Sequence, residues 1–261
     1  MMLKNKNALI TGSTSGIGLA AAHVLAKQGI NLVLHGLMSE SEGETLAKQF
    51  ADDYGINTLF DGANLSDPEE ITTMIERVSN QMGGIDILVN NAGIQHTESV
   101  DKFPVDKWNA IIAINLSSAF HTIQQTLPHM QQNNWGRIIN IASVHGLVGS
   151  VNKSAYVAAK HGIVGLTKVV ALENANNGIT ANSICPGWVE TPLINKQIED
   201  IAQAKNIDMA QAKHELITAK QPKAQMAQTN HIGELILFLC SDAASSITGS
   251  ALPIDGAWTA Q

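Results

Sequence analysis

A tyrosine and a lysine stand four positions apart, at Tyr156 and Lys160, in a segment with the pattern of a helix. Residues four apart share one helix face, so the phenol and the ammonium can lie close together. A phenol has a pKa of about 10, and a neighbouring ammonium lowers it by favouring the phenolate. We therefore expect Tyr156 to exchange a proton with an alcohol or carbonyl oxygen. Because such pairs are common on exposed helices, this reading depends on the other motifs.

A glycine-rich turn near the amino terminus predicts a dinucleotide site. Gly12, Gly16 and Gly18 lie where a strand-like run passes into an apolar helical segment. Glycines there let the turn tighten, let the backbone approach a pyrophosphate and let the helix pack close to a sheet. The helix amino terminus adds free N–H groups and positive potential for the phosphates.

The elements that must position these residues follow from the alternation of short apolar runs with longer amphipathic segments. The strand-like runs are 7–11, 31–35, 57–61, 85–90, 137–142, 179–185 and 251–254. The helical segments are 16–28, 41–53, 66–82, 105–132, 154–176 and 228–241. This alternation predicts a single α/β domain, 1–261, of Rossmann type, with a doubly wound parallel sheet of about seven strands and helices on both faces.

Two local features refine this picture. Ser66 and Glu69, around Pro68, have the spacing of a capping box and mark one helix start. The polar stretch 190–227 is inserted after the sixth strand, beyond the carboxyl ends of the strands, where open α/β sheets bind ligands. We expect it to form a helical substrate lid; an ordinary surface excursion is the alternative.

Bulk properties exclude several classes of protein. A net charge of -7 over 261 residues disfavours a nucleic-acid partner. No signal peptide is recognisable, and no run approaches the roughly 18 apolar residues of a membrane span, so we expect a cytoplasmic protein without a membrane partner. Cys185 and Cys240 lie in apolar segments and are expected to be buried free thiols. No cysteine or histidine cluster has metal-ligand spacing, so no metal is expected.

The order of the remaining motifs resembles the short-chain dehydrogenase/reductase family over essentially the whole chain. The motifs are Gly-xxx-Gly-x-Gly at 12–18, Asn90-Asn91-Ala92-Gly93, Asn115, Ser143, Tyr156-Val157-Ala158-Ala159-Lys160 and Pro186-Gly187. The resemblance implies that Ser143 hydrogen-bonds the substrate oxygen, that Lys160 also holds the nicotinamide ribose, and that Asn115 positions a water in a proton relay. It also implies a homotetramer, with the helix that carries Tyr156 packed between subunits.

The nucleotide contacts are read from the turn and carried over from the family motifs. They are Gly12, Thr14, Ser15, Gly16, Ile17, Gly18, Asn64, Leu65, Asn91, Ala92, Gly93, Tyr156, Lys160, Pro186, Gly187, Val189 and Thr191. NADP binding needs a cation for the 2′-phosphate, and neither the glycine turn nor Gly36-Leu37-Met38 offers one, so NAD is expected. Two departures from the family are the missing acidic residue at Gly36-Leu37 and Asn64 in place of an aspartate.

Polar residues beside the catalytic motifs indicate an anionic substrate. Gln95, His145 and Lys153 should approach the reaction centre from separate loops and could clamp a carboxylate, although Lys153 alone could be a solvated loop lysine. The segments around these residues resemble the family's bacterial dehydrogenases of D-3-hydroxybutyrate, a likeness that adds Gln197 to the clamp. It also places Trp188 and Trp258 at the pocket border, where they would select short acids. A packing or subunit-contact role is the alternative for Trp258.

The expected reaction is therefore the reversible, NAD-dependent oxidation of D-3-hydroxybutyrate to acetoacetate. One alternative is an NADPH-dependent reductase of carrier-bound 3-ketoacyl groups from the same family, which would need a 2′-phosphate cation and an open pocket. The other is a non-catalytic nucleotide sensor, which should have a broken Ser143, Tyr156 and Lys160 set. This chain has that set intact.

Overall fold

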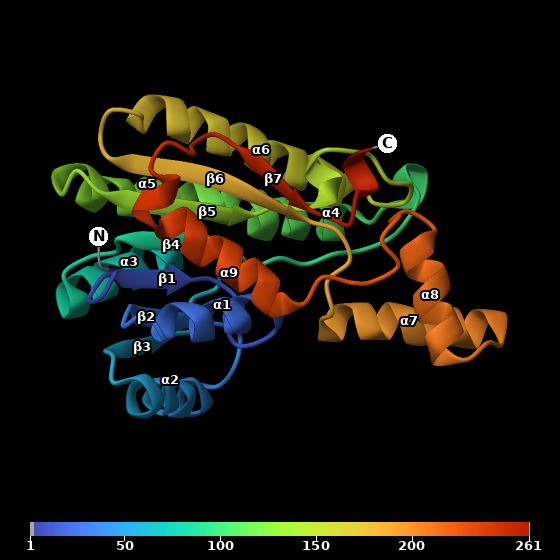
Figure 1. Ribbon diagram of the computed structural model, residues 1–261, viewed down its shortest axis with the longest axis horizontal. Coiled ribbons are helices and arrows are strands. Elements are labelled where there is room, and N and C mark those ends of the chain that lie inside the picture. The colour runs from blue at the N-terminus through green and yellow to red at the C-terminus, as the bar shows by residue number, and fades with distance from the viewer. Residues whose placement is uncertain (1–2, 261) are drawn as a thin grey trace.

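The computed structural model describes residues 3–260 and has one parallel sheet at its centre (Figure 1). Neighbouring strands follow the order β3-β2-β1-β4-β5-β6-β7, and every pair is parallel. The strands are β1 Asn7–Ile10, β2 Asn31–His35, β3 Thr58–Asp61, β4 Ile87–Asn90, β5 Gly136–Ile141, β6 Ile179–Pro186 and β7 Ala251–Ile254. The order reverses between β1 and β4, which creates a crevice at their carboxyl ends.

Helices cover both faces of the sheet, as the sequence predicts. They are α1 Gly16–Ala26, α2 Glu40–Tyr54, α3 Pro68–Met82, α4 Val105–Ile112, α5 Ser118–Gln132, α6 Ser154–Asn174, α7 Pro192–Lys205, α8 Met209–Thr218 and α9 Thr229–Cys240. Successive strand residues point to opposite faces, so Ile10 joins a core with α1, α2 and α9, whereas Leu9 joins a core with α3, α5 and α6. Cys185 and Cys240 are buried free thiols, which confirms that expectation.

Two helix predictions need correction. Asp67, not Ser66, caps α3: its carboxylate accepts a hydrogen bond from the Glu69 backbone N–H at 2.9 Å, while the Ser66 hydroxyl donates to Asn64. The reason is that Pro68 occupies the first helical position, which makes residue 67 the cap. The segment 105–132 is not a uniform helix either, because a π-helical turn over Ala113–Ser117 separates α4 from α5.

Helix α6 is long and apolar enough, by length and composition, to cross a membrane, contrary to the expectation that no segment approaches such a span. The apolar composition of α6 is explained by its packing inside the protein. Ile163, Thr167 and Val170 are among its buried residues, and the helix packs against β6 and the Val144–Gly146 turn. The apolar residues of α6 therefore serve the core, and its first turns carry Tyr156 and Lys160.

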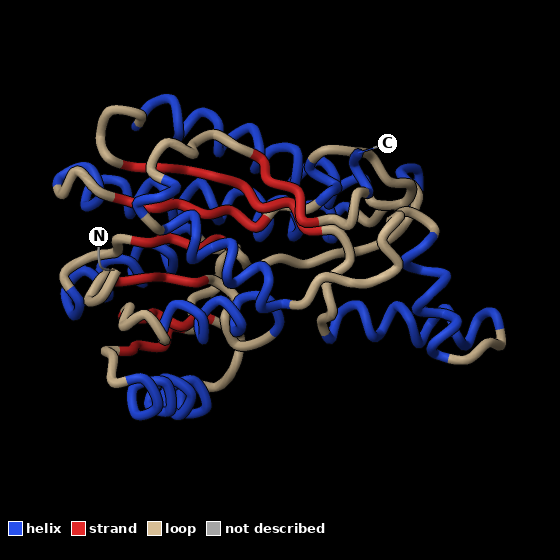
Figure 2. Tube along the Cα trace, viewed as in Figure 1, coloured by secondary structure: helices blue, strands red, loops and turns tan. Residues whose placement is uncertain are grey.

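The segment 190–227 forms the expected helical excursion, with α7 and α8 projecting from the body beyond the carboxyl end of β6 (Figure 1). It has a hydrophobic cluster of its own, which includes Ile198 and Ile217 and is joined by Trp188. Its two connections to the body run side by side (Figure 2) because Val189 and Ala227 form a β-bridge. The excursion is therefore a compact unit with few backbone links to the body, which include the bond from the Lys223 N–H to the Gly256 carbonyl oxygen at 3.1 Å.

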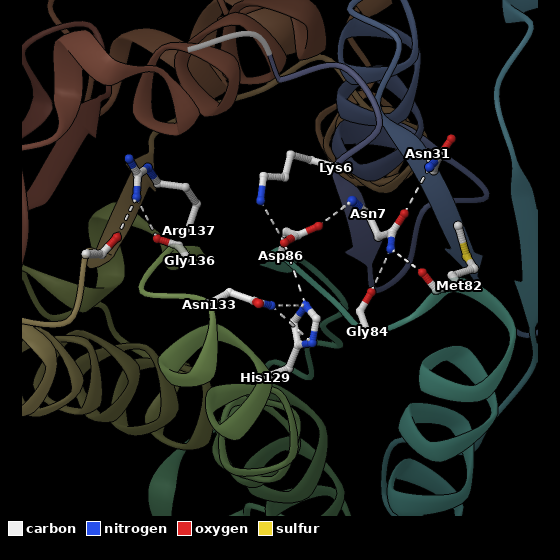
Figure 3. Close-up of polar contacts among 11 residues, drawn as sticks. Lys6, Asn7, Asn31, Met82, Gly84, Asp86, His129, Asn133, Gly136 and Arg137 are labelled. Carbon is white, nitrogen blue, oxygen red and sulfur yellow. Dashed lines mark hydrogen bonds and ion pairs between the residues drawn. The ribbon is translucent and has the colours of Figure 1, made fainter.

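Polar side chains pair at the amino-terminal ends of the strands, in one group around Asp86 and another around Arg137, whose Nε has no partner within the described structure (Figure 3). The buried Asp86 carboxylate accepts from Lys6 Nζ at 3.0 Å and from the Asn7 backbone N–H at 2.9 Å. Arg137 donates to the carbonyl oxygens of Gly136 and Gly178. These bonds tie strand starts together, so we assign both groups to structure rather than to chemistry.

Candidate active site

The glycine turn approaches neighbouring backbone so closely that side chains would not fit. Gly12 has a φ of +64° and Gly16 a φ of +56°, the left-handed region that favours glycine. A Cβ on Gly18 would lie 2.3 Å from the Gly12 carbonyl oxygen. The Asn91 side chain fixes the turn by donating to the carbonyl oxygens of Thr11 and Gly12, at 2.9 and 3.0 Å. The exposed backbone above this turn fits a pyrophosphate.

A cleft of about 520 Å³ opens beside this turn, at the carboxyl ends of the strands. Its volume is in the range of small-molecule sites. Of the residues expected to contact nucleotide, the cleft brings together Gly12, Thr14, Ser15, Gly16, Ile17, Asn64, Leu65, Asn91, Ala92, Gly93, Tyr156, Lys160, Pro186, Gly187, Val189 and Thr191. Gly18 does not line it, because Gly18 packs behind the turn. Gln95 and Ser143 line the same cleft.

The expected catalytic groups converge from three elements. Ser143 follows β5, and its Oγ accepts from the His145 backbone N–H at 3.2 Å. Tyr156 and Lys160 come from the start of α6, with Lys160 Nζ 5.6 Å from the centre of the phenol ring. Lys160 is buried, and Nζ donates to the Ile141 carbonyl oxygen at 2.7 Å. These groups therefore meet in the lining of the cleft.

Asn115 lies in the π-helical turn behind this group. Its side chain is buried and pairs with the Ile94 backbone, accepting from the N–H and donating to the carbonyl, each at 2.9 Å. It thus supports the loop that leads to Gln95. π-helical turns recur at functional sites because they shift the helix backbone locally.

Burial is the main influence on the electrostatics of Tyr156 and Lys160. Burial raises the pKa of the Tyr156 phenol, and a hydrogen bond with Ser143 opposes that rise. Burial also lowers the pKa of Lys160 to about 8, so its ammonium is itself disfavoured. Removal from water is therefore the larger effect on the phenol, and the lowering of the phenol pKa by Lys160 stays a prediction.

A second cluster, of aromatic and basic side chains, borders Tyr156. The His145 ring lies 6.1 Å from the Tyr156 ring and 5.5 Å from that of Trp258, which in turn lies 5.4 Å from Trp188. Lys153 Nζ lies 5.8 Å from the centre of the Trp188 ring. The expected substrate residues His145, Lys153, Trp188 and Trp258 are therefore contiguous.

This cluster has polar atoms in need of partners. His145 Nδ1 and Trp188 Nε1 are buried without hydrogen-bond partners in the described structure. Burial, followed by the charge of Lys153, lowers the pKa of His145 to about 4, so its imidazole is neutral near pH 7. Burial also lowers the pKa of Lys153. A small anion between these groups would satisfy the unpaired atoms.

Gln197 lies apart from this cluster. It is a partly exposed residue of α7, and within residues 3–260 its side chain makes no hydrogen bond to the cluster. His35 is a site residue that the sequence interpretation missed: it lines the cleft and contacts the glycine turn. The available signal was a histidine at the end of the second strand, directly before the position where the acidic residue is missing. Across residues 3–260 no group of three or more His, Cys, Asp or Glu side chains converges as a metal site.

Comparison with known proteins agrees with this architecture. Residues 6–202 match the short chain dehydrogenase family. The chain is 52% identical over 260 residues to D-beta-hydroxybutyrate dehydrogenase of Cupriavidus necator, covering 100% of both chains. It is 51% identical over 256 residues to the protein of the same name in Rhizobium meliloti, covering 98% of this chain and 99% of that protein. L-sorbose reductase from Gluconobacter frateurii, solved with NADPH and L-sorbose, superposes with a TM-score of 0.92 at 28% identity, covering 98% of each chain. The chain belongs to the short-chain dehydrogenase family, whose members use NAD or NADP.

Proposed function

We propose that the protein is an NAD-dependent 3-hydroxybutyrate dehydrogenase, which reversibly oxidises D-3-hydroxybutyrate to acetoacetate. The observation that carries the proposal is the cluster of Lys153, His145 and two tryptophans against Tyr156, which matches a short carboxylate. The names of the two relatives at 52% and 51% identity support the same substrate.

The residues have the following roles in this proposal. Tyr156 takes the proton of the substrate hydroxyl in oxidation and returns it in reduction. The single hydroxyl hydrogen of Ser143 is donated to the phenol oxygen in the free site and to the reacting oxygen once the substrate is bound. Lys160, anchored on the Ile141 carbonyl oxygen, holds the nicotinamide ribose, and Asn115 holds a water that relays the proton. Bound NAD would supply the carbon that accepts the hydride.

The substrate carboxylate lies at the second cluster. Lys153 contributes charge and the neutral His145 contributes a hydrogen bond, with Gln95 at the edge of the cleft. Trp188 and Trp258 enclose the methyl end, which limits chain length. Closure of the 190–227 lid brings Gln197 to the carboxylate, since Gln197 lies outside the cluster in this conformation.

Charge supports NAD over NADP. The adenosine end of the cleft is lined by Ser15, Gly36, Leu37 and Asn64, none of them basic. The Glu70 carboxylate accepts from the Asn64 backbone N–H at 2.7 Å, which adds negative charge beside this end of the cleft, whereas a 2′-phosphate favours a cation. By family resemblance the enzyme acts as a homotetramer. Its net charge of -7 argues against a nucleic-acid partner, and we propose that it works in the cytoplasm without a membrane partner.

The test is oxidation of a panel of short hydroxy acids, with NAD and with NADP, followed through the absorbance of the reduced nicotinamide. We expect D-3-hydroxybutyrate with NAD to be the preferred pair. Tyr156→Phe should abolish turnover while NAD still binds. Preference for NADPH and a carrier-bound 3-ketoacyl group would favour the reductase alternative, and normal turnover by Tyr156→Phe would refute the assigned base.

A further inference from the structure

The last residue of β2, His35, bridges two segments of the cleft through its ring. The Gly12 backbone N–H donates to His35 Nδ1 at 3.1 Å, and His35 Nε2 lies 2.9 Å from the Ala63 carbonyl oxygen. The ring is 3% exposed, so water does not replace these partners. A backbone N–H can only donate and a carbonyl can only accept, so Nδ1 must be bare and Nε2 must carry the hydrogen. One neutral tautomer satisfies both bonds.

These two bonds join parts of the site that belong to different elements. Gly12 lies in the glycine turn after β1, whereas Ala63 precedes Asn64 in the loop after β3. Ser13 also pairs with the His35 backbone, through N–H to carbonyl at 2.8 Å and through its Oγ at 2.9 Å. The imidazole of His35 then connects the glycine turn to the loop at Ala63 through the bond from Nε2. It therefore fixes the spacing between the two walls of the adenosine end.

We propose that His35 is a positioning residue of the nucleotide site, which holds the glycine turn and the Ala63 loop together in its neutral form and weakens nucleotide binding when protonated. The inference rests on the nucleotide site of the proposed function and extends it. A proton on Nδ1 would face the Gly12 N–H, and two donors cannot pair. The turn must then shift, together with the backbone groups that meet the pyrophosphate.

The charges around His35 define the sign of this effect. Asp61, opposite His35 in β3, favours the protonated ring, as does the bond to the Ala63 carbonyl. Asp61 is itself paired with Arg77 of α3 and accepts from the Ala63 N–H. The residues that contact the ring from the β1 side, Gly12 and Ser13, carry no charge. Burial outweighs these contributions and lowers the pKa of His35, so the ring is neutral near pH 7.

A simple charge model makes the opposite prediction. The diphosphate of a bound nucleotide would favour a cationic imidazole nearby, and affinity would then rise on acidification. In our proposal affinity is constant above the His35 pKa and falls as the pH drops through it. The limiting slope is about tenfold per pH unit, because one proton must leave before binding.

The experiment measures ADP-ribose affinity by calorimetry, from mildly alkaline to mildly acidic pH, in three proteins. ADP-ribose lacks the reacting nicotinamide, and Tyr156 and Lys160 are present in all three proteins, so any contribution of their titration to binding is common to the comparison. The three proteins are the wild type, His35→Asn, whose amide oxygen can accept from Gly12 without titrating, and His23→Asn. His23 is a matched control because burial also lowers its pKa, and its ring packs on Phe50 and bonds to Tyr54, on the side of α1 covered by α2.

We expect the wild type and His23→Asn to lose affinity at acidic pH with the same slope. His35→Asn should retain most of the affinity near pH 7 and lose the acid dependence. Equal pH dependence in wild type and His35→Asn would overturn the inference while leaving the proposed function intact. Failure of the wild type to bind ADP-ribose at any pH would refute the nucleotide site itself.

A second measurement does not depend on a folded variant. Nitrogen-15 imidazole spectra of the wild type report which ring nitrogen of His35 is protonated near pH 7. The inference requires a bare Nδ1 and a protonated Nε2, and a titration that coincides with the loss of affinity. The opposite tautomer, or a doubly protonated ring in the nucleotide complex, would overturn it.

Discussion

Replacement of Ser143 by alanine tests how the protein controls its proposed base. Ser143 is buried and its Oγ accepts from the His145 N–H, which leaves the hydroxyl hydrogen free to point at the phenol. Its bond to Tyr156 lowers the phenol pKa, which burial otherwise raises. Ser143→Ala removes that donor without adding bulk. The phenol pKa should therefore rise further.

The size of the effect follows from the charge on the acceptor. A hydrogen bond to a charged group contributes about 1.5–3 kcal/mol. Since about 1.4 kcal/mol corresponds to a factor of ten, loss of this bond raises the phenol pKa and lowers the phenolate fraction about 10- to 100-fold at a pH below the phenol pKa.

The assay is the pH profile of kcat/KM for 3-hydroxybutyrate oxidation. Oxidation requires the unprotonated phenol, so the rate rises with pH through the Tyr156 pKa, and this rising limb should move to higher pH in Ser143→Ala. Ser143→Thr keeps the hydroxyl and should leave the limb near its original position. A Ser143→Ala enzyme that is slower by one factor at every pH would refute the reasoning, because Ser143 would then act on the substrate alone.

Three further predictions address the nucleotide, the carboxylate and the lid. Gly18→Ala should weaken NAD binding about 5- to 150-fold in calorimetry, since overpacking of about 1–3 kcal/mol distorts the turn. Gly55→Ala, strained by its φ of +64° but outside the cleft lining, should leave binding unchanged, and equal effects would contradict the turn's role. Lys153→Met should raise the KM for 3-hydroxybutyrate about tenfold or more, because a charged hydrogen bond to the carboxylate is lost, and should leave the KM for NAD unchanged. The control is Lys168→Met, at an exposed lysine, and an unaltered KM for 3-hydroxybutyrate in Lys153→Met would show that Lys153 does not bind the carboxylate. The Glu190 carboxylate accepts from Lys213 at 2.9 Å and from Gln228 at 2.7 Å, so Glu190→Gln should speed amide hydrogen exchange of α8 by up to about fivefold, the effect of losing a surface ion pair. Asp52→Asn, which removes the surface ion pair with Lys48, is the control, and exchange in Glu190→Gln that matches the wild type would show that Glu190 does not hold the lid.

Features set by local periodicity were predictable from the sequence. The seven strands and the helices between them follow from apolar runs and their spacing, and the ordered motifs placed the cleft at the correct strand ends. Local competition between residues was harder to judge. Ser66 has a capping-box partner at the right spacing, yet Asp67 is an equally good cap and stands directly before Pro68. The π-helical turn around Asn115 depends on a shift in backbone bonding that no residue pattern reveals.

Properties that depend on burial could not be read from spacing. The positions of Tyr156 and Lys160 indicate proximity, but only the fold shows that both groups leave water and that Ser143 provides the opposing effect on the phenol. The same holds for His35. Its sequence position suggests a ribose contact, whereas its two bonds run to Gly12 and Ala63, which are 23 and 28 residues away.

Helices α7 and α8 lie between the bridged residues Val189 and Ala227, and the excursion also contacts the body where the Lys223 N–H donates to the Gly256 carbonyl oxygen at 3.1 Å. Insertions or substitutions in α7 and α8 alter what covers the substrate without changing the spacing of strands β1 and β4. Trp188 packs both on Trp258 and on the apolar cluster of the excursion, so changes in that cluster can reach the residues around Tyr156 through Trp188. In the course of evolution, sequence changes in the 190–227 segment could therefore alter the substrate while the nucleotide cleft and its glycine turn stay the same.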